Sequence, residues 1–222
     1  MPIKKIKFPT TIDLDRFISV QAHDLRTPFN HIIGFSKMTL NTVGDAPLTN
    51  FQKEDLGTVY RSGLRALSLM NGLIDIARIN RHEKELHLSD INLQQLVEQG
   101  LAQWKKFNPA SEVQVEPHII VTSQTIHADE QLLKQVITGF IAYVALYCEA
   151  KAKVNITVEE IPDQFIFTFA SVGTKARLPS ELDLEMFGYV NRTFVELQAG
   201  KILQAEENDG GALIKFAIRK SH

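Results

Sequence analysis

The chain has 222 residues, of which 44% are hydrophobic, and this is enough apolar content for one or two domains with ordinary cores. Its formal net charge of −2 gives no reason to expect nucleic acid or an acidic membrane surface as a partner. The single cysteine, Cys148, excludes an internal disulfide framework and is typical of a reducing cytoplasm, and no apolar run approaches the ~20 residues of a membrane span.

The N-terminal part of the chain, residues 1–80, is predicted to form two long helices. The first is expected over residues 12–43, and Pro28 inside it predicts a local bend just below His23, because proline removes one backbone hydrogen bond. A helical seam is indicated by apolar residues spaced 4, 7, 7 and 3 positions apart, namely Leu14, Ile18, Leu25, Ile32 and Phe35. His23 falls about 200° around the helix from Leu25 and is therefore expected to face outward.

The second helix carries an apolar heptad seam over three repeats, made of Leu56, Tyr60, Gly63, Leu67, Met70, Ile74 and Ala77. Two helices of about 30 residues cannot bury two such seams against each other without leaving apolar surface in water. Pairing with a second copy gives a dimeric four-helix bundle, which is the expected arrangement. The alternative is a hairpin that docks on the second domain of its own chain.

Residues 81–222 form the second predicted domain, after a charged linker around residues 79–88. Asp90 or Asn92 is expected to cap its first helix. Its helices are predicted at 93–107, 129–150 and 181–198, and its strands at 112–116, 125–128, 154–160, 164–170, 201–206 and 212–219. This order predicts an α/β sandwich with helices on one face of a mixed sheet, so the chain as a whole belongs to the α+β class.

One segment of the first helix carries a specific motif. It reads His23-Asp24-Leu25-Arg26-Thr27-Pro28, followed by Ile32-Ile33-Gly34-Phe35, and it resembles the phospho-acceptor box of two-component sensor histidine kinases. The resemblance implies a homodimeric phospho-acceptor hairpin followed by a lobe shaped like the kinase ATPase domain. In outline the chain is similar to bacterial histidine phosphotransferases derived from such kinases.

The residue types around His23 suit phosphoryl transfer. A neutral imidazole nitrogen is nucleophilic near pH 7, and Asp24 can accept the other ring N–H and fix the tautomer or ease proton loss. Arg26 can hold phosphoryl oxygens or a partner carboxylate bidentately. The resemblance implies that Thr27 positions water against a phospho-aspartate, and that a response-regulator receiver domain docks on a face made of Ala22, Arg26, Thr27 and Asn30. The other histidines, including His31, lack ligand-like spacing, so no metal site is predicted.

The nucleotide-binding chemistry of the family is the part that the second domain lacks. Gly139 and Tyr143 stand where the resemblance places two asparagines, and neither supplies an amide oxygen for Mg²⁺. Ser171 replaces the acid that contacts adenine. The two glycine boxes are reduced to Gly173 and Gly188. We therefore expect no bound cofactor, with ATP and Mg²⁺ required only if the chain is a diverged but working kinase.

The leading hypothesis is a cytoplasmic phosphorelay protein that is phosphorylated on His23 and exchanges the phosphoryl group with a response-regulator aspartate. An upstream histidine kinase is a further candidate donor, and the absence of a sensor domain ahead of the histidine helix favours a relay. One alternative is an active ATP-dependent sensor histidine kinase with an unusual nucleotide site. Another is a non-catalytic regulatory scaffold that dimerises with kinases or sequesters a regulator.

Overall fold

The computed structural model describes residues 13–41, 48–109, 111–148, 151–172, 181–208 and 211–220. It divides the chain into two compact units, Met1–Glu85 and Leu86–His222, which we call the hairpin and the lobe. Among the described residues, no helix combines the length and the apolar content needed to cross a membrane.

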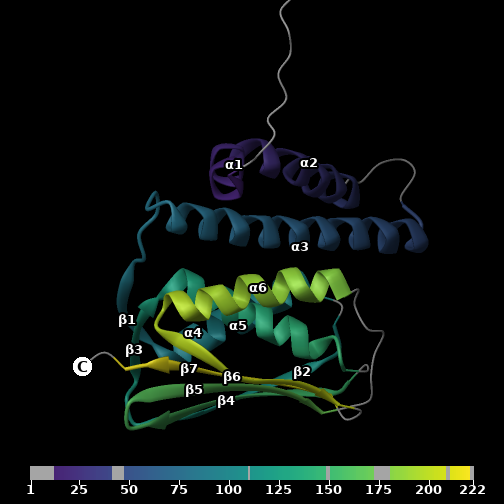
Figure 1. The fold of residues 1–222 in the computed structure, drawn as a ribbon. Coiled ribbons are helices and arrows are strands. Elements are labelled where there is room, and N and C mark those ends of the chain that lie inside the picture. Colours follow the sequence, from purple (N-terminus) through teal and green to yellow (C-terminus); the bar gives the residue numbers. More distant parts are fainter. Residues whose placement is uncertain are drawn as a thin grey trace, which may run out of the picture. The chain divides into compact units, whose positions relative to one another are not determined.

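The hairpin consists of α1 (Leu14–Val20), α2 (Ala22–Asn41) and α3 (Asn50–Asn80), and α2 lies alongside α3 (Figure 1). The starts of α1 and α3 are capped by side chains. Asp13 accepts a hydrogen bond from the Arg16 amide at 3.0 Å, and Thr49 forms a reciprocal capping box with Gln52 at the start of α3. These caps satisfy amide groups that have no partner within the helix.

The prediction of a single long first helix is wrong, because the structure has two helices, α1 and α2, separated at Gln21. Hydrogen bonding continues across the interruption, since the Leu25 amide donates to the Gln21 carbonyl at 2.9 Å. Pro28, where the sequence predicts a local bend, does not interrupt α2, which continues to Asn41. The missing proline N–H affects only the carbonyl of Asp24, an exposed residue whose carbonyl can be hydrated.

The two predicted seams differ in burial. The α3 seam is confirmed, since Gly63, Ile74 and Ala77 are buried and its other members are half-buried. A Cβ added at Gly63 would lie 3.0 Å from Cγ1 of Ile33, so glycine allows α2 to approach α3 closely. The first seam stays exposed within a single chain, as the sequence predicts in the absence of a second copy: the exposed fractions of Leu14, Ile32 and Phe35 are 64%, 44% and 64%. A single α3 covers only one side of α1 and α2.

Polar contacts tie α1 to the end of α3 and to the residues that follow it. The Ser19 hydroxyl donates to the Glu83 carboxylate, which also accepts from Nε of Arg81 at 2.6 Å. Asn80 Nδ2 donates to Asp15 at 3.2 Å. The hydrogen bonds from Ser19 and then Arg81 lower the pKa of Glu83 below its ordinary value. These contacts fix α1 against the residues that follow α3.

The lobe places α4, α5 and α6 over one face of a five-stranded sheet of order β2-β4-β5-β7-β6 (Figure 1). Strands β2 and β4 are parallel and the other pairs antiparallel, while β1 and β3 form a separate antiparallel pair. The elements are β1 (Leu88–Asn92), α4 (Leu93–Phe107), β2 (Gln114–Ile120), β3 (Thr125–Asp129), α5 (Glu130–Ala145), β4 (Lys153–Ile161), β5 (Gln164–Val172), α6 (Glu181–Leu197), β6 (Gly200–Asn208) and β7 (Gly211–Arg219). The predicted α+β class, with helices on one face of a mixed sheet, is confirmed.

Some predicted boundaries in the lobe are wrong. Strand β1 lies where a linker and cap were expected, and only Ile91 of its five residues is buried, so no alternation marks it. Asn92 nevertheless caps α4, accepting from the Gln95 amide at 3.0 Å. Strand β2 continues through Pro117, and α5 ends at Ala145 rather than at residue 150.

The core of the lobe is aromatic. Phe216 on β7 stacks on Phe167 of β5, with ring centroids 4.8 Å apart and an interplanar angle of 3°. Phe140 of α5 closes on the same cluster, 5.8 Å from Phe169 and 5.6 Å from Phe216. These rings fix α5 against the centre of the sheet. Helix α5 carries Gly139 and Tyr143, the two positions of the predicted degenerate nucleotide site that precede Ser171.

Candidate functional site

His23 is the second residue of α2 and points into solvent. Its side chain is 91% exposed and that of Asp24 is 77% exposed, and His23 Nδ1 lies 3.2 Å from Asp24 Oδ1. A carboxylate only accepts, so Nδ1 is the donor when this contact is a hydrogen bond. In the part of the chain that the structure describes, no hydrogen bond engages Nε2 of His23. The ring therefore presents an unencumbered nitrogen to solvent.

Arg26 and Thr27, one turn further along α2, are both engaged within the hairpin. The Thr27 hydroxyl donates to the His23 carbonyl at 2.9 Å, so its proton is used locally while its oxygen lone pairs stay available. Arg26 is half-buried, and its Nε donates to Oδ1 of Asn71 on α3 at 2.6 Å. Sequence reasoning missed Asn71, because no local pattern connects residues 45 positions apart.

The predicted docking face needs one correction. Ala22 is 3% exposed, so it is part of the packed hairpin and offers a partner almost no surface. Asn30 is exposed, whereas Arg26 and Thr27 are half-buried. His31, on the same helix, is also exposed, and its ring packs against Phe35 with centroids 6.3 Å apart. Among the described residues, no group of three or more His, Cys, Asp or Glu side chains could hold a metal ion.

In the lobe, the position of Gly139 is closed by a neighbouring side chain. A Cβ built on Gly139 would lie 2.4 Å from Oδ1 of Asn191, which is 4% exposed and belongs to α6. Asn191 Nδ2 in turn donates to the Phe187 carbonyl at 2.8 Å. Asn191 therefore occupies the space beside Gly139, and this position accepts a larger side chain only if the Asn191 side chain shifts.

Tyr143, one turn further along α5, belongs to an aromatic stack. Its ring faces Phe187 of α6, with centroids 5.8 Å apart and an interplanar angle of 19°, and it lies 5.5 Å from the ring of Tyr147. The Tyr147 hydroxyl donates to the Tyr143 hydroxyl at 3.3 Å. The stacked rings of Tyr143 and Phe187 place apolar surface between α5 and α6. The sequence does not predict that Tyr143 stacks on Phe187, although Phe187 directly precedes Gly188, a residue of the predicted nucleotide site.

Ser171 and Cys148 lie elsewhere in the lobe. Ser171 is 7% exposed near the end of β5, and its hydroxyl oxygen accepts a hydrogen bond from the Ala212 amide at 2.8 Å. The hydroxyl thus joins β5 to β7. Burial raises the pKa of the neighbouring Cys148 thiol. Gly173, the last of the predicted nucleotide-site residues, lies outside the described residues.

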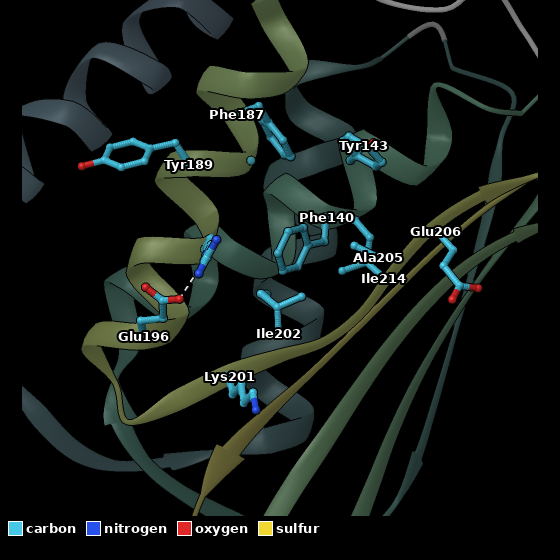
Figure 2. A pocket seen from close by; sticks show the side chains of 12 residues that line it. Phe140, Tyr143, Phe187, Tyr189, Glu196, Lys201, Ile202, Ala205, Glu206 and Ile214 are labelled. Carbon is cyan, nitrogen blue, oxygen red and sulfur yellow. Dashed lines mark hydrogen bonds and ion pairs between the residues drawn. The ribbon is translucent and has the colours of Figure 1, made fainter. Parts of the chain in front are cut away.

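A cavity of about 720 Å³ lies between α5, α6 and strands β6 and β7 (Figure 2). Its walls include the rings of Phe140, Tyr143 and Phe187. At its rim, Arg192 Nε donates to Glu196 at 2.7 Å, and this hydrogen bond raises the pKa of Arg192. Of the residues predicted for a nucleotide site, Tyr143 and Gly188 line this cavity, whereas Gly139 and Ser171 do not.

An exposed histidine–aspartate pair on a helical hairpin is followed along the chain by a lobe with helices on one face of a mixed sheet. Residues 13–82 match the His Kinase A (phospho-acceptor) domain. The chain is similar to two-component sensor histidine kinases.

Three known proteins that resemble the chain are named as histidine kinases or have a similar fold. The circadian input-output histidine kinase CikA of Synechococcus elongatus is 26% identical over 159 residues, covering 71% of this chain and 21% of CikA. Full-length ShkA in complex with AMPPNP has a similar fold, with a TM-score of 0.66, 21% identity, and coverage of 94% of this chain and 46% of ShkA. The kinase ThkA in complex with the response regulator TrrA gives a TM-score of 0.56 and 18% identity, covering 94% of this chain and 62% of ThkA. The chain spans about a quarter of the length of the curated relatives it matches.

Proposed function

We propose that this chain is a phosphotransfer protein of two-component signalling in which His23 exchanges a phosphoryl group with a receiver-domain aspartate, and that the lobe contributes no ATP-dependent activity. The observation that carries the proposal is the His23 ring, which is 91% exposed and held by Asp24 at 3.2 Å. A macromolecular partner can reach such a ring directly. The proposed domains are a dimerisation and histidine phosphotransfer domain, residues 1–80, and a degenerate ATPase-like domain, residues 81–222.

The proposed reaction is an in-line phosphoryl transfer. With the ring proton held on Nδ1 by Asp24, the lone pair of His23 Nε2 attacks phosphorus of an aspartyl phosphate. The new N–P bond forms as the P–O bond to the aspartate breaks, and the electron pair leaves with its carboxylate. The ring then carries positive charge on the Nδ1 side, which the Asp24 carboxylate stabilises. The reverse sequence returns the phosphoryl group, and a water held by the Thr27 oxygen is the proposed route to hydrolysis.

Three positions in the lobe support the absence of an ATP-dependent step. The space beside Gly139 is filled by Asn191, the Tyr143 ring stacks on Phe187, and the Ser171 hydroxyl is bonded to the backbone of β7. Neither the Tyr143 ring nor the Ser171 hydroxyl offers a carboxylate or amide oxygen to a Mg²⁺ ion. The amide oxygen of Asn191 lies beside Gly139 in a side chain that is 4% exposed. We therefore derive no step through ATP. A receiver domain brings its own phosphoryl group, so the hairpin needs to supply only a nucleophile and a docking surface.

A homodimer is part of the proposal. Eight exposed large apolar side chains belong to the described part of the hairpin: Leu14, Phe17, Val20, Ile32, Phe35, Met38, Phe51 and Val59. A second copy that covers this surface completes a four-helix bundle and removes the surface from water. The proposed transfer partner is a response-regulator receiver domain, by analogy with the complex of ThkA and TrrA. A cytoplasmic location stays a prediction.

A second candidate function is an ATP-dependent histidine kinase. The lobe favours it to the extent that its fold resembles that of ShkA, which was solved with AMPPNP. Calorimetry with Mg-ATP and with Mg-ADP separates the candidates. The phosphotransfer proposal expects no saturable heat from either nucleotide, whereas micromolar binding of both would support the kinase.

The proposal is tested by label transfer. Receiver domains phosphorylated with ³²P-acetyl phosphate are mixed with the purified full chain, and acid-labile, base-stable label on the chain is followed. We expect label on the unmodified chain and on His31→Ala, which removes an exposed histidine of the same helix, and none on His23→Ala. Label that persists on His23→Ala would falsify the assignment of His23.

A further inference from the structure

Arg26 lies three residues after His23 on α2 and is fixed to the neighbouring helix. Its Nε donates to Oδ1 of Asn71 at 2.6 Å, and both side chains are half-buried. Hydrogen bonds from a charged donor are shorter and stronger than neutral ones. The guanidinium is therefore held against α3 before any partner arrives.

The bond to Asn71 uses only one edge of the guanidinium. Arginine has five N–H donors in a planar fork, and Nε carries one of them. Among the described residues, no acceptor binds the terminal amino groups Nη1 and Nη2 of Arg26. Thr27 uses its hydroxyl proton on the His23 carbonyl, so Arg26 keeps the free donors on this part of the helix. Side chains three residues apart on a helix are neighbours, with Cβ atoms about 5–6 Å apart.

We propose that Asn71 is a positioning residue for phosphoryl transfer at His23, an inference that rests on the proposed function. Asn71 binds Arg26 through Nε and thereby leaves the Nη edge to contact the oxygens of the phosphoryl group in transit. A planar guanidinium can donate two parallel hydrogen bonds to such oxygens. Because Arg26 is ordered in the folded hairpin, less of its conformational freedom is lost when the phosphoryl group arrives. Arg26 remains protonated throughout, and the bonds made and broken are those at phosphorus described above.

The inference is tested by the rate of label transfer from a ³²P-phosphorylated receiver domain to the full chain. Asn71→Ala is expected to slow transfer about tenfold, the effect of losing one hydrogen bond to a charged group. Asn71→Asp keeps an oxygen acceptor at the same place and is expected to stay within about twofold of the unmodified chain. Ser68→Ala, at an exposed position one turn earlier on α3, is the matched control and leaves the rate unchanged.

A double-mutant cycle separates positioning from a general effect on the fold. In the Arg26→Ala background, Asn71→Ala is expected to have no further effect, because both changes remove the same contact. Arg26→Lys leaves Asn71 in place and keeps the charge but not the planar fork, and it is expected to show the same tenfold loss. This second variant tests the inference even if Asn71→Ala fails to fold, which thermal unfolding of each variant would reveal.

Several results would overturn the inference while leaving the proposed function intact. They are a folded Asn71→Ala that transfers at the unmodified rate, an equal loss in the Arg26→Ala background, and an Arg26→Lys variant with full activity. The proposed function fails in a different way, through label that reaches His23→Ala as fast as the unmodified chain.

Discussion

The hairpin and the lobe differ in where their chemically important side chains lie. In the hairpin, His23 and Asp24 are exposed, and large apolar side chains such as Phe35 remain at the surface. In the lobe, the positions at which the family's nucleotide chemistry is expected are packed: Gly139 lies against Asn191, and Tyr143 lies against Phe187. In one unit the histidine–aspartate pair is exposed, whereas in the other the positions of Gly139 and Tyr143 take part in packing.

This difference indicates how a fold can persist when a site within it changes. The aromatic cluster around Phe216 and the sheet register do not depend on a bound triphosphate. Asn191 packs beside Gly139 and Phe187 stacks on Tyr143, so these positions take part in the packing between α5 and α6. The comparison therefore predicts that core substitutions in the lobe affect stability, whereas apolar surface substitutions in the hairpin affect association.

The largest expected effect comes from two matched phenylalanine substitutions. Phe216→Ala removes a fully buried ring from the lobe core and should lower the free energy of unfolding by about 3–5 kcal/mol. Phe35→Ala changes a ring that is 64% exposed and should change the same quantity by less than about 0.5 kcal/mol, while weakening self-association. The free energy of unfolding is measured by urea unfolding, followed by the fluorescence of Trp104, the single tryptophan. Self-association is measured by sedimentation velocity. A Phe35→Ala chain as dimeric as the unmodified one would contradict the proposed bundle surface.

A smaller effect is expected from two glycines near the α5–α6 contact. Gly139→Ala would place its Cβ 2.4 Å from Asn191 Oδ1 and should lower the free energy of unfolding by about 1–3 kcal/mol. Gly188→Ala, inside α6, has no neighbouring atom within 4 Å and should raise it by up to about 1 kcal/mol, because alanine favours helix more than glycine. Both are measured by urea unfolding. Equal effects of the two variants would mean that Asn191 does not close the space beside Gly139.

The smallest effect concerns acid stability of the lobe. Glu160 accepts hydrogen bonds from Lys220 Nζ at 2.6 Å and from Ser123, which lower the pKa of its carboxyl to about 2. Since the folded pKa is depressed, its stabilising contribution is complete above the unfolded pKa, near 4.5, and is lost as the pH falls from there towards 2. Glu160→Gln should therefore reduce the slope of the free energy of unfolding against pH between 4.5 and 2.

Exposed Glu159 on the same strand provides the control for that change. Glu159→Gln should leave the slope of stability against pH between 4.5 and 2 closer to that of the unmodified chain than Glu160→Gln does. The measurement is thermal unfolding at closely spaced pH values. An unchanged slope in Glu160→Gln would show that the contacts with Lys220 and Ser123 do not persist in solution.

Periodicity and capping signals predicted most of the fold. The α3 seam and the strands at β4, β5, β6 and β7 follow from spacing within the sequence. The misses have physical reasons. Strand β1 pairs with β3 across a long sequence separation and buries only Ile91, and the interruption at Gln21 leaves backbone hydrogen bonding continuous.

The candidate site was predicted less completely. His23 and Asp24 are adjacent in sequence, so their pairing could be expected from the motif alone. The contact between Arg26 and Asn71 depends on how α2 is registered against α3, and the stack of Tyr143 on Phe187 depends on how α5 meets α6. Neither relation is encoded in local spacing. Ala22 was predicted to lie on the docking face near His23, but it is 3% exposed in the packed hairpin.

The most direct test of the account compares two phosphoryl donors on the same purified chain. One sample receives [γ-³²P]ATP with Mg²⁺, and the other receives a ³²P-phosphorylated receiver domain, with His23→Ala as the control in both. The account predicts label on His23 from the receiver domain and none from ATP. Label on His23 from ATP would contradict it.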